Sequence, residues 1–229
     1  MARSRAPRII GKVFRTLLML LIITVVSILA WRIFVSEKYT DAKGLSPNDA
    51  LLSAYTEHGE DLILQYQNQS SSITRGKKNY GYFSVVDSVF IPQANQVQIV
   101  VRYNNSTLEH LKEDYHLTEM PDRTQNLYDV TIVLNNTQTG EKVRIQPSGD
   151  PICENTRLYT YRRFTFDNVT FDASVTDVFV DIYYKEDVNY DADAYGRLVI
   201  YDHTYKWLPY ELSKDEKKRL DAALTTQNG

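Results

Sequence analysis

Residues 177–184 read Asp-Val-Phe-Val-Asp-Ile-Tyr-Tyr, and residues 96–103 read Gln-Val-Gln-Ile-Val-Val-Arg-Tyr. In both stretches apolar side chains recur at every second position, which is the period of a β-strand with one buried face. A helix would place its apolar side chains three or four positions apart. The two stretches therefore predict strands that turn one face toward a core and the other toward water.

The same alternation continues through residues 79–212. Shorter examples are Val130/Ile132/Leu134, Val143/Ile145, Phe164/Phe166 and Leu198/Ile200, and a further strand is expected over residues 80–90. The turn-forming residues 135–140 predict a hairpin loop between two of these strands. About seven strands at short spacing predict a mainly all-β fold, an antiparallel immunoglobulin-like β-sandwich.

Short helices are expected beside these strands. Ser46-Pro47-Asn48-Asp49 predicts a helix start with Ser46 as its cap. The capping-box pattern Ser106-Thr107-Leu108-Glu109 predicts a second helix, which runs to about Tyr115. Leu51, Leu52 and Tyr55 give the first helix an apolar side, and the second helix is expected as an insertion between strands.

An apolar segment near the N-terminus predicts one transmembrane helix over residues 16–35. The stretch from Thr16 to Trp31 contains no charged side chain. A helix of about 20 residues is about 30 Å long, which matches the hydrocarbon layer of a bilayer, so the lipid bilayer is the expected partner of this segment. The alternative is a signal peptide that is cleaved after Ala30.

Residues 1–15 form a basic tail that sets the expected orientation. The tail has five basic and no acidic side chains, which predicts a cytoplasmic N-terminus. The remaining chain is then expected outside the cell, joined to the plasma membrane by a single pass. It divides into a stalk, short helix and polar loop (36–78), a β domain (79–212) and a charged C-terminal tail (213–229), which is expected to lie loose at the surface.

Charge and cysteine content restrict the partners and the source. Residues 1–35 hold six basic and no acidic side chains, so the remaining 20 basic and 29 acidic residues give residues 36–229 a net charge of −9. Such a domain repels nucleic acid, and we expect no nucleic-acid partner.

The single cysteine, Cys153, cannot form a disulfide within the chain, which favours a Gram-positive bacterial source. Sequons such as Asn135-Asn136-Thr137 keep a eukaryotic secretory-pathway membrane as the alternative.

The acidic stretch at residues 187–193 is the candidate metal site. Oxygen-bearing side chains occupy alternate positions in it: Asp187, Asn189, Asp191 and Asp193. Calcium loops have this spacing because the ion takes six to eight oxygen ligands. An EF-hand would also need a glycine at Ala192 and a carboxylate at Leu198, and both are missing. Calcium is thus the one cofactor that the pattern suggests, and the alternative is a solvated acidic turn.

Asp202 and His203 are the candidate catalytic pair. A carboxylate can orient an imidazole, but the sequence shows no partner nucleophile. Ser148 lacks the GxSxG elbow, and Cys153 lies in a stretch that resembles a turn. The four histidines do not have the spacing of a zinc site. We therefore assign no catalytic residue.

These features favour a non-enzymatic, membrane-anchored interaction module of the cell envelope that binds a protein or glycan partner. Aromatic clusters such as Tyr201/Tyr205/Trp207/Tyr210 could stack on sugar rings, or they could pack across strands. Two alternatives stay open. One is an envelope hydrolase that uses the Asp202/His203 region or the loop at 187–193, and the other is a structural subunit of a larger membrane complex.

Overall fold

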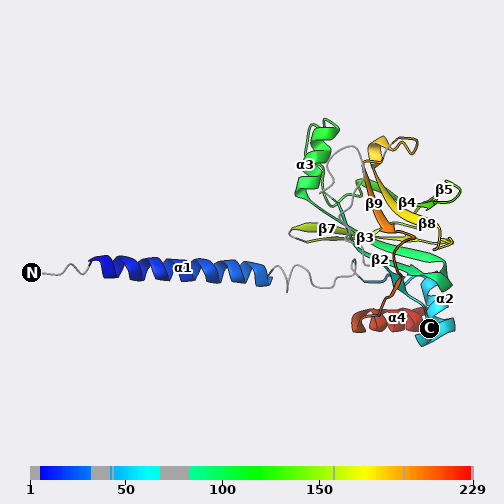
Figure 1. Cartoon of the computed structure of the whole chain (residues 1–229), viewed down its shortest axis with the longest axis horizontal. Helices are drawn as coiled ribbons and strands as arrows, with labels where there is room; N and C mark the ends of the chain where they lie inside the picture. Colours follow the sequence, from blue (N-terminus) through cyan, green and yellow to red (C-terminus); the bar gives the residue numbers. More distant parts are fainter. Residues whose placement is uncertain are drawn as a thin grey trace, which may run out of the picture. The chain divides into compact units, whose positions relative to one another are not determined.

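The computed structural model of the chain describes residues 6–31, 42, 44–67, 83–156, 158–192 and 194–227. It divides into two compact units, residues 1–39 and residues 40–229. The first unit contains one long helix, and the second is mostly β-structure with two antiparallel sheets (Figure 1). The expected order, an apolar N-terminal helix followed by a mainly β domain, is therefore confirmed.

The helix of the first unit is α1 (Ala6–Trp31). Its segment Val13–Trp31 contains 19 residues with a mean hydropathy of 2.5. At 1.5 Å per residue this segment is about 28 Å long, so it is long and apolar enough to cross a membrane. A signal sequence has the same properties. The last four residues of the expected span, 32–35, lie outside the described residues.

The second unit contains a six-stranded sheet with the order β10-β1-β2-β3-β7-β6 and a four-stranded sheet with the order β5-β4-β8-β9. The strands are β1 (Gln65–Tyr66), β2 (Ser84–Ile91), β3 (Gln96–Asn104), β4 (Tyr128–Asn136), β5 (Lys142–Ile145), β6 (Ile152–Asn155), β7 (Tyr159–Phe166), β8 (Thr176–Tyr184), β9 (Gly196–Tyr201) and β10 (Leu208–Pro209). The helices are α2 (Asp49–His58), α3 (Asn105–Asp114) and α4 (Lys214–Gln227), with 3₁₀ turns at Gly59–Asp61, Pro92–Ala94 and Lys185–Asp187.

One hydrophobic core receives side chains from both sheets. Val97 and Ile99 of β3 and Val178 and Val180 of β8 are each 0% exposed and belong to this core. The alternation in residues 96–103 and 177–184 therefore predicted the core face correctly. Burial of each such side chain stabilises the fold by about 1.5–3 kcal/mol. The expectation that the opposite face meets water is wrong for β3, because Gln96, Gln98 and Val100 are also 0% exposed.

The outer face of the six-stranded sheet is also covered. Val89 and Ile91 of β2, which alternate with the core residue Phe90, pack with Leu51 of α2 and Leu220 of α4 in a second cluster. Figure 1 shows α2 and α4 side by side below this sheet. Leu220 is 1% exposed, so the expectation of a loose C-terminal tail is wrong. The segment has so many charged side chains that its sequence did not indicate the buried face that contains Leu220.

Two helix caps lie two residues from their predicted positions. Asn48 caps α2 in place of Ser46, and Asn104 caps α3 in place of Ser106. The backbone N–H and C=O of Ser46 instead form hydrogen bonds of 2.8 and 2.9 Å with the side-chain amide of Gln98. This pairing engages the backbone of Ser46 outside the helix, which begins after it. Asparagine and serine cap helices about equally well, which is why composition could not choose between them.

Candidate functional site

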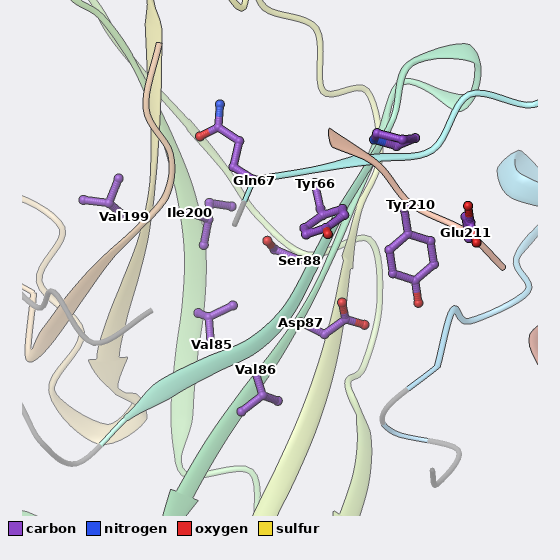
Figure 2. Close-up of a pocket in the computed structure, with 11 residues that line it drawn as sticks. Tyr66, Gln67, Val85, Val86, Asp87, Ser88, Val199, Ile200, Tyr210 and Glu211 are labelled. Carbon is purple, nitrogen blue, oxygen red and sulfur yellow. The ribbon is translucent and has the colours of Figure 1, made fainter. Parts of the chain in front are cut away.

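A pocket of about 570 Å³ opens beside β2 (Figure 2). One side consists of Val85, Val86 and Ser88 of β2 together with Val199 and Ile200 of β9. The other side consists of Tyr66 of β1, Tyr210 and Glu211 just after β10, and Asp87 of β2. Figure 2 shows the Asp87 carboxylate and the Tyr210 ring on the same side of β2, below Tyr66. The pocket therefore joins strands from both sheets.

A β-bulge in β2 shapes the pocket. The register of β2 against β3 shifts between Val85 and Asp87, which leaves Val86 as the extra residue. Val85 is 5% exposed in the core, whereas Val86 is 40% exposed. Bulges redirect side chains and bend the strand locally, and they occur often at the edges of sheets and beside functional sites. Here the bulge gives the pocket an exposed apolar side chain.

Two sheet edges meet at the pocket. β1 pairs with β2 only through Gln65 and Phe90, so among the described residues Ser84–Ser88 pair with β3 alone. β9 is the last strand of the four-stranded sheet and pairs with β8. The backbone N–H and C=O groups of an edge strand can pair with a further extended chain. The pocket thus lies where such a chain could be added.

A buried ion pair lies against the pocket. Nη2 of Arg163 is 2.9 Å from Oδ2 of Asp87; the arginine side chain is fully buried and the aspartate side chain is 21% exposed. Nη1 and Nε of Arg163 donate to the Gln98 side chain at 3.0 Å and to the Ala42 carbonyl at 3.2 Å. Burial raises the pKa of Asp87 above its ordinary value, and the nearby charge of Arg163 only partly opposes this effect.

The tyrosines and Gln67 are held in place by their own contacts. The rings of Tyr66 and Tyr210 meet edge to face, with centroids 6.2 Å apart, and the Tyr210 hydroxyl donates to Oε1 of Glu216 at 2.8 Å. The Gln67 amide accepts from the N–H of Asp202 at 2.9 Å and donates to the Asp202 and Tyr205 carbonyls at 3.1 Å. One wall of the pocket is therefore continuous with the loop that contains Asp202 and His203.

The structure brings the candidate pair Asp202 and His203 together with a third residue, Asp177. Nδ1 of His203 lies 2.7 Å from Oδ1 of Asp177 and 3.9 Å from Oδ1 of Asp202. Within the described part of the chain, these three are the one group of His, Cys, Asp and Glu side chains placed closely enough to share a metal ion. Burial raises the pKa of Asp202, but hydrogen bonds from Thr204 and the charge of His203 outweigh it, so the pKa is lowered.

Asp177 was missed as a site residue because it lies 26 positions before His203 in the sequence. In the sequence, Asp177 is only one of the polar residues that alternate with the apolar residues of a predicted strand. The pairing of β8 with β9 brings Val178 opposite Tyr201, and this register places Asp177 beside the residues that follow β9. A predicted hairpin register between these two strands would have found it.

The candidate calcium loop has a different arrangement. Asp187, Asn189 and Asp191 are exposed, and Oδ1 of Asn189 accepts the N–H of Asp191 at 3.0 Å. Asp193 lies outside the described residues. Calcium binding at 187–193 stays a prediction.

Ser148 follows β5 and Cys153 lies on β6, whereas Asp202 and His203 follow β9. Cys153 is exposed on β6, a strand rather than the expected turn, where it pairs with Arg162 of β7. The hydroxyl of Ser148 accepts the N–H of Asp167 at 2.8 Å.

Most aromatic side chains pack inside the domain, as with Tyr201 and Trp207, whose ring centroids are 4.4 Å apart. Tyr205 is 57% exposed.

Comparisons of this chain with protein-family models, curated proteins and solved structures found no match. The fold and the site define a β domain that follows an apolar helix and has a pocket between two sheet edges.

Proposed function

We propose that the protein is a membrane-anchored binding module of the cell envelope and that a partner protein binds along β2 and β9. The pocket of about 570 Å³ between the Ser84–Ser88 part of β2, which pairs only with β3, and the edge strand β9 is the observation that carries the proposal. Its size falls within the range of small binding sites, and its walls combine apolar side chains with a few polar groups. A partner in extended conformation would pair with an edge and insert a side chain into the pocket.

We further infer an immunoglobulin-like arrangement of the two sheets. In support, the main strands follow the orders β2-β3-β7-β6 and β5-β4-β8-β9. If β2 is lettered A, the following strands become B, C, C′, D, E, F and G in chain order. The two sheets then have the orders A-B-E-D and C′-C-F-G, which are the orders of immunoglobulin-like domains. A fold does not determine a function, so the proposal depends on the pocket rather than on this likeness.

The charge of the pocket favours a basic side chain of the partner. Glu211 brings a carboxylate to its lining and Asp87 is already paired with Arg163, whereas no lysine or arginine is among the described lining residues. Residues 36–229 carry a net charge of −9, which would speed the approach of a basic partner. A glycan is less well suited, because Tyr66 and Tyr210 pack edge to face against each other instead of presenting a flat stacking surface.

The location in the envelope is inferred from the N-terminal segment. The helix α1 is long and apolar enough to cross a membrane, and five basic residues precede the span. The positive-inside rule then places the N-terminus in the cytoplasm and the β domain outside. A plasma membrane of a Gram-positive bacterium is the proposed setting, because the domain has no pair of cysteines.

Site-specific photocrosslinking in intact cells tests the proposal. A photoreactive amino acid replaces Val86 in the pocket or, as a matched control, Val143 on the edge strand β5; the two valines are 40% and 46% exposed. We expect a crosslink to one envelope protein from position 86 and none from position 143. Equal crosslinking from both positions, or none from position 86, would contradict the proposed binding edge.

An envelope hydrolase is the second candidate, and one observation favours it. Asp177, Asp202 and His203 lie together, and an imidazole beside two carboxylates could activate a water molecule. A hydrolase would lose its activity when His203 is replaced by alanine, whereas a binding module would keep its crosslink from position 86.

A further inference from the structure

The loop after β9 and the first residues of β8 bring two carboxylates and one imidazole to a single point. We propose that Asp177, Asp202 and His203 form a binding site for a divalent transition-metal ion, for which Zn²⁺ is the probe. The proposal uses residues outside the pocket and does not rest on the proposed binding function. Its test and the crosslinking test can therefore fail separately.

The three ligand atoms have the separation that one ion requires. Metal–ligand distances of about 2.0–2.2 Å place neighbouring ligand atoms roughly 2.8–3.6 Å apart in octahedral or tetrahedral geometry. Nδ1 of His203 is 2.7 Å from Oδ1 of Asp177 and 3.9 Å from Oδ1 of Asp202, and the three residues each offer one ligand atom within 4.8 Å of the other two. The observed distances bracket the required ones, so small side-chain rotations suffice.

Hydrogen bonds already orient both carboxylates. Oδ1 of Asp177 accepts the backbone N–H of His203 at 3.0 Å. Oδ1 of Asp202 accepts the N–H and the hydroxyl of Thr204 at 2.8 and 2.6 Å. Supporting contacts of this kind hold metal ligands in place before the ion arrives. The loop therefore loses little freedom when an ion binds.

Gln67 fixes the same loop from the side of the pocket. Its side-chain amide forms three hydrogen bonds to backbone groups of Asp202 and Tyr205, and Gln67 is only 6% exposed. The site is thus held by β8 on one side and by Gln67 on the other. An ion bound there would tie Asp177 to a residue 26 positions later.

The ligand set and its exposure indicate the type of ion. An imidazole nitrogen suits zinc, copper, nickel and iron, whereas calcium and magnesium prefer ligand sets made of oxygen alone. The side chains of Asp177, His203 and Asp202 are 19%, 30% and 32% exposed, so water can occupy the remaining coordination positions. Two carboxylates would neutralise a divalent charge, and three protein ligands leave a coordination position open for water or another ligand.

Calorimetry on the full chain in detergent, purified with a histidine-free tag and treated with a chelator, tests the site. We expect ZnCl₂ to bind with one-site saturation and CaCl₂ to bind at least 100-fold more weakly. Zinc at a hundred times its Kd should raise the Tm by about 5–10 °C for a protein of this size. Absence of saturable zinc binding, or equal affinity for calcium, would overturn the proposal.

Matched variants locate the ion. His203→Asn and Asp177→Asn should each weaken zinc binding at least tenfold. His110→Asn is the control for the imidazole, because His110 lies 3.6 Å from Glu113 outside the three-residue group. Asp172→Asn is the control for the carboxylate, because Oδ1 of Asp172 accepts from the N–H and hydroxyl of Ser174 in the same way that Asp202 binds Thr204. Both controls should bind zinc within twofold of the wild type.

A measurement on the unmodified chain covers the case in which a variant does not fold. Co²⁺ titrated into the wild type should produce visible d–d absorption that saturates at one ion per chain and disappears when Zn²⁺ is added. Absence of the band would contradict a site with nitrogen and oxygen ligands, as would unchanged zinc affinity in a folded His203→Asn variant.

Discussion

Arg163 and Asp87 form an ion pair with 2.9 Å between Nη2 and Oδ2, and the same guanidinium donates to the carbonyl of Ala42. One side chain of β7 is therefore bound to β2, beside the pocket, and to the first described residue of the second unit. The Gln98 side chain extends this arrangement, because it accepts from Arg163 and pairs with the backbone of Ser46. The wall of the pocket and the entry of the chain into the domain thus share one buried polar network.

Arg163→Met should destabilise the domain by about 3 kcal/mol, because it leaves a largely buried carboxylate without its partner. Urea unfolding of the wild type and the variant measures this loss. Arg102→Met is the control: Arg102 lies over the ring of Tyr159 at 4.6 Å and is only partly buried, so its loss should cost less than about 1 kcal/mol. Equal losses for both variants would show that the ion pair has no special role.

Glu216→Ala should release α4 from the sheet. Glu216 is 1% exposed, and its carboxylate accepts from the N–H of Leu45 at 2.9 Å, the Tyr210 hydroxyl at 2.8 Å and the N–H of Ser213 at 2.8 Å. Loss of these charge-assisted bonds should cost about 2–3 kcal/mol and speed hydrogen exchange in α4. The exposed neighbour Asp215→Ala should leave both unchanged.

Two buried tyrosines should respond in opposite ways to loss of the hydroxyl group. The Tyr103 hydroxyl accepts from Nε of Arg162 at 3.0 Å, so Tyr103→Phe should destabilise by about 1–3 kcal/mol. The Tyr128 hydroxyl is buried without a hydrogen-bond partner among the described residues, so Tyr128→Phe should be neutral or stabilise by about 1 kcal/mol. Thermal unfolding of the two variants decides the point. A loss in Tyr128→Phe as large as that in Tyr103→Phe would contradict the assigned contacts.

The strands could be predicted from the sequence because alternation directly reports which face is buried. Val97 and Ile99 repeat every second position, and they lie in the core. The same rule could not show that Gln96 and Gln98 are buried as well, at 0% exposure. Their face is covered by the segment at residues 44–58 and by α4, and such cover depends on contacts between residues far apart in the sequence.

The site was harder to predict than the strands. Asp202 and His203 were found because they are adjacent in the sequence, whereas Asp177 joins them only through the register of β8 and β9. The pocket depends on the bulge at Val86 and on two strands from different sheets. Short β1 and β10 strands, each of two residues, are too short to give a periodic signal. Local patterns therefore predicted elements, and pairing between distant strands determined the site.

Membrane retention tests the role of α1. The segment Val13–Trp31 has a mean hydropathy of 2.5, so the full chain should stay in the membrane pellet after carbonate extraction. Replacing Leu21 and Ile22 with aspartate should prevent stable insertion, because each charge near the middle of the span costs about 3 kcal/mol. Replacing Arg3 and Arg5 with glutamine should leave the pellet fraction unchanged. Recovery of a soluble wild-type chain that begins at Trp31 would instead identify a cleaved signal sequence.

The stability contributed by Asp87 should fall as pH rises. Burial raises the pKa of Asp87, so the native state holds this proton more tightly than the unfolded state, whose aspartate pKa is about 4. The contribution is complete below pH about 4 and is lost as pH rises through the raised pKa. We therefore compare the free energy of unfolding of the wild type with that of Asp87→Asn. The wild-type value minus the variant value should decrease between pH about 4 and the raised pKa of Asp87, by at most about 1.4 kcal/mol per pH unit, and become constant above that pKa.

Asp172→Asn is the control. For this variant the same difference should increase with pH, because hydrogen bonds from Ser174 lower the pKa of Asp172. A difference that grows with pH for Asp87 would mean that the attraction of Arg163 outweighs the cost of burial at this edge of the pocket.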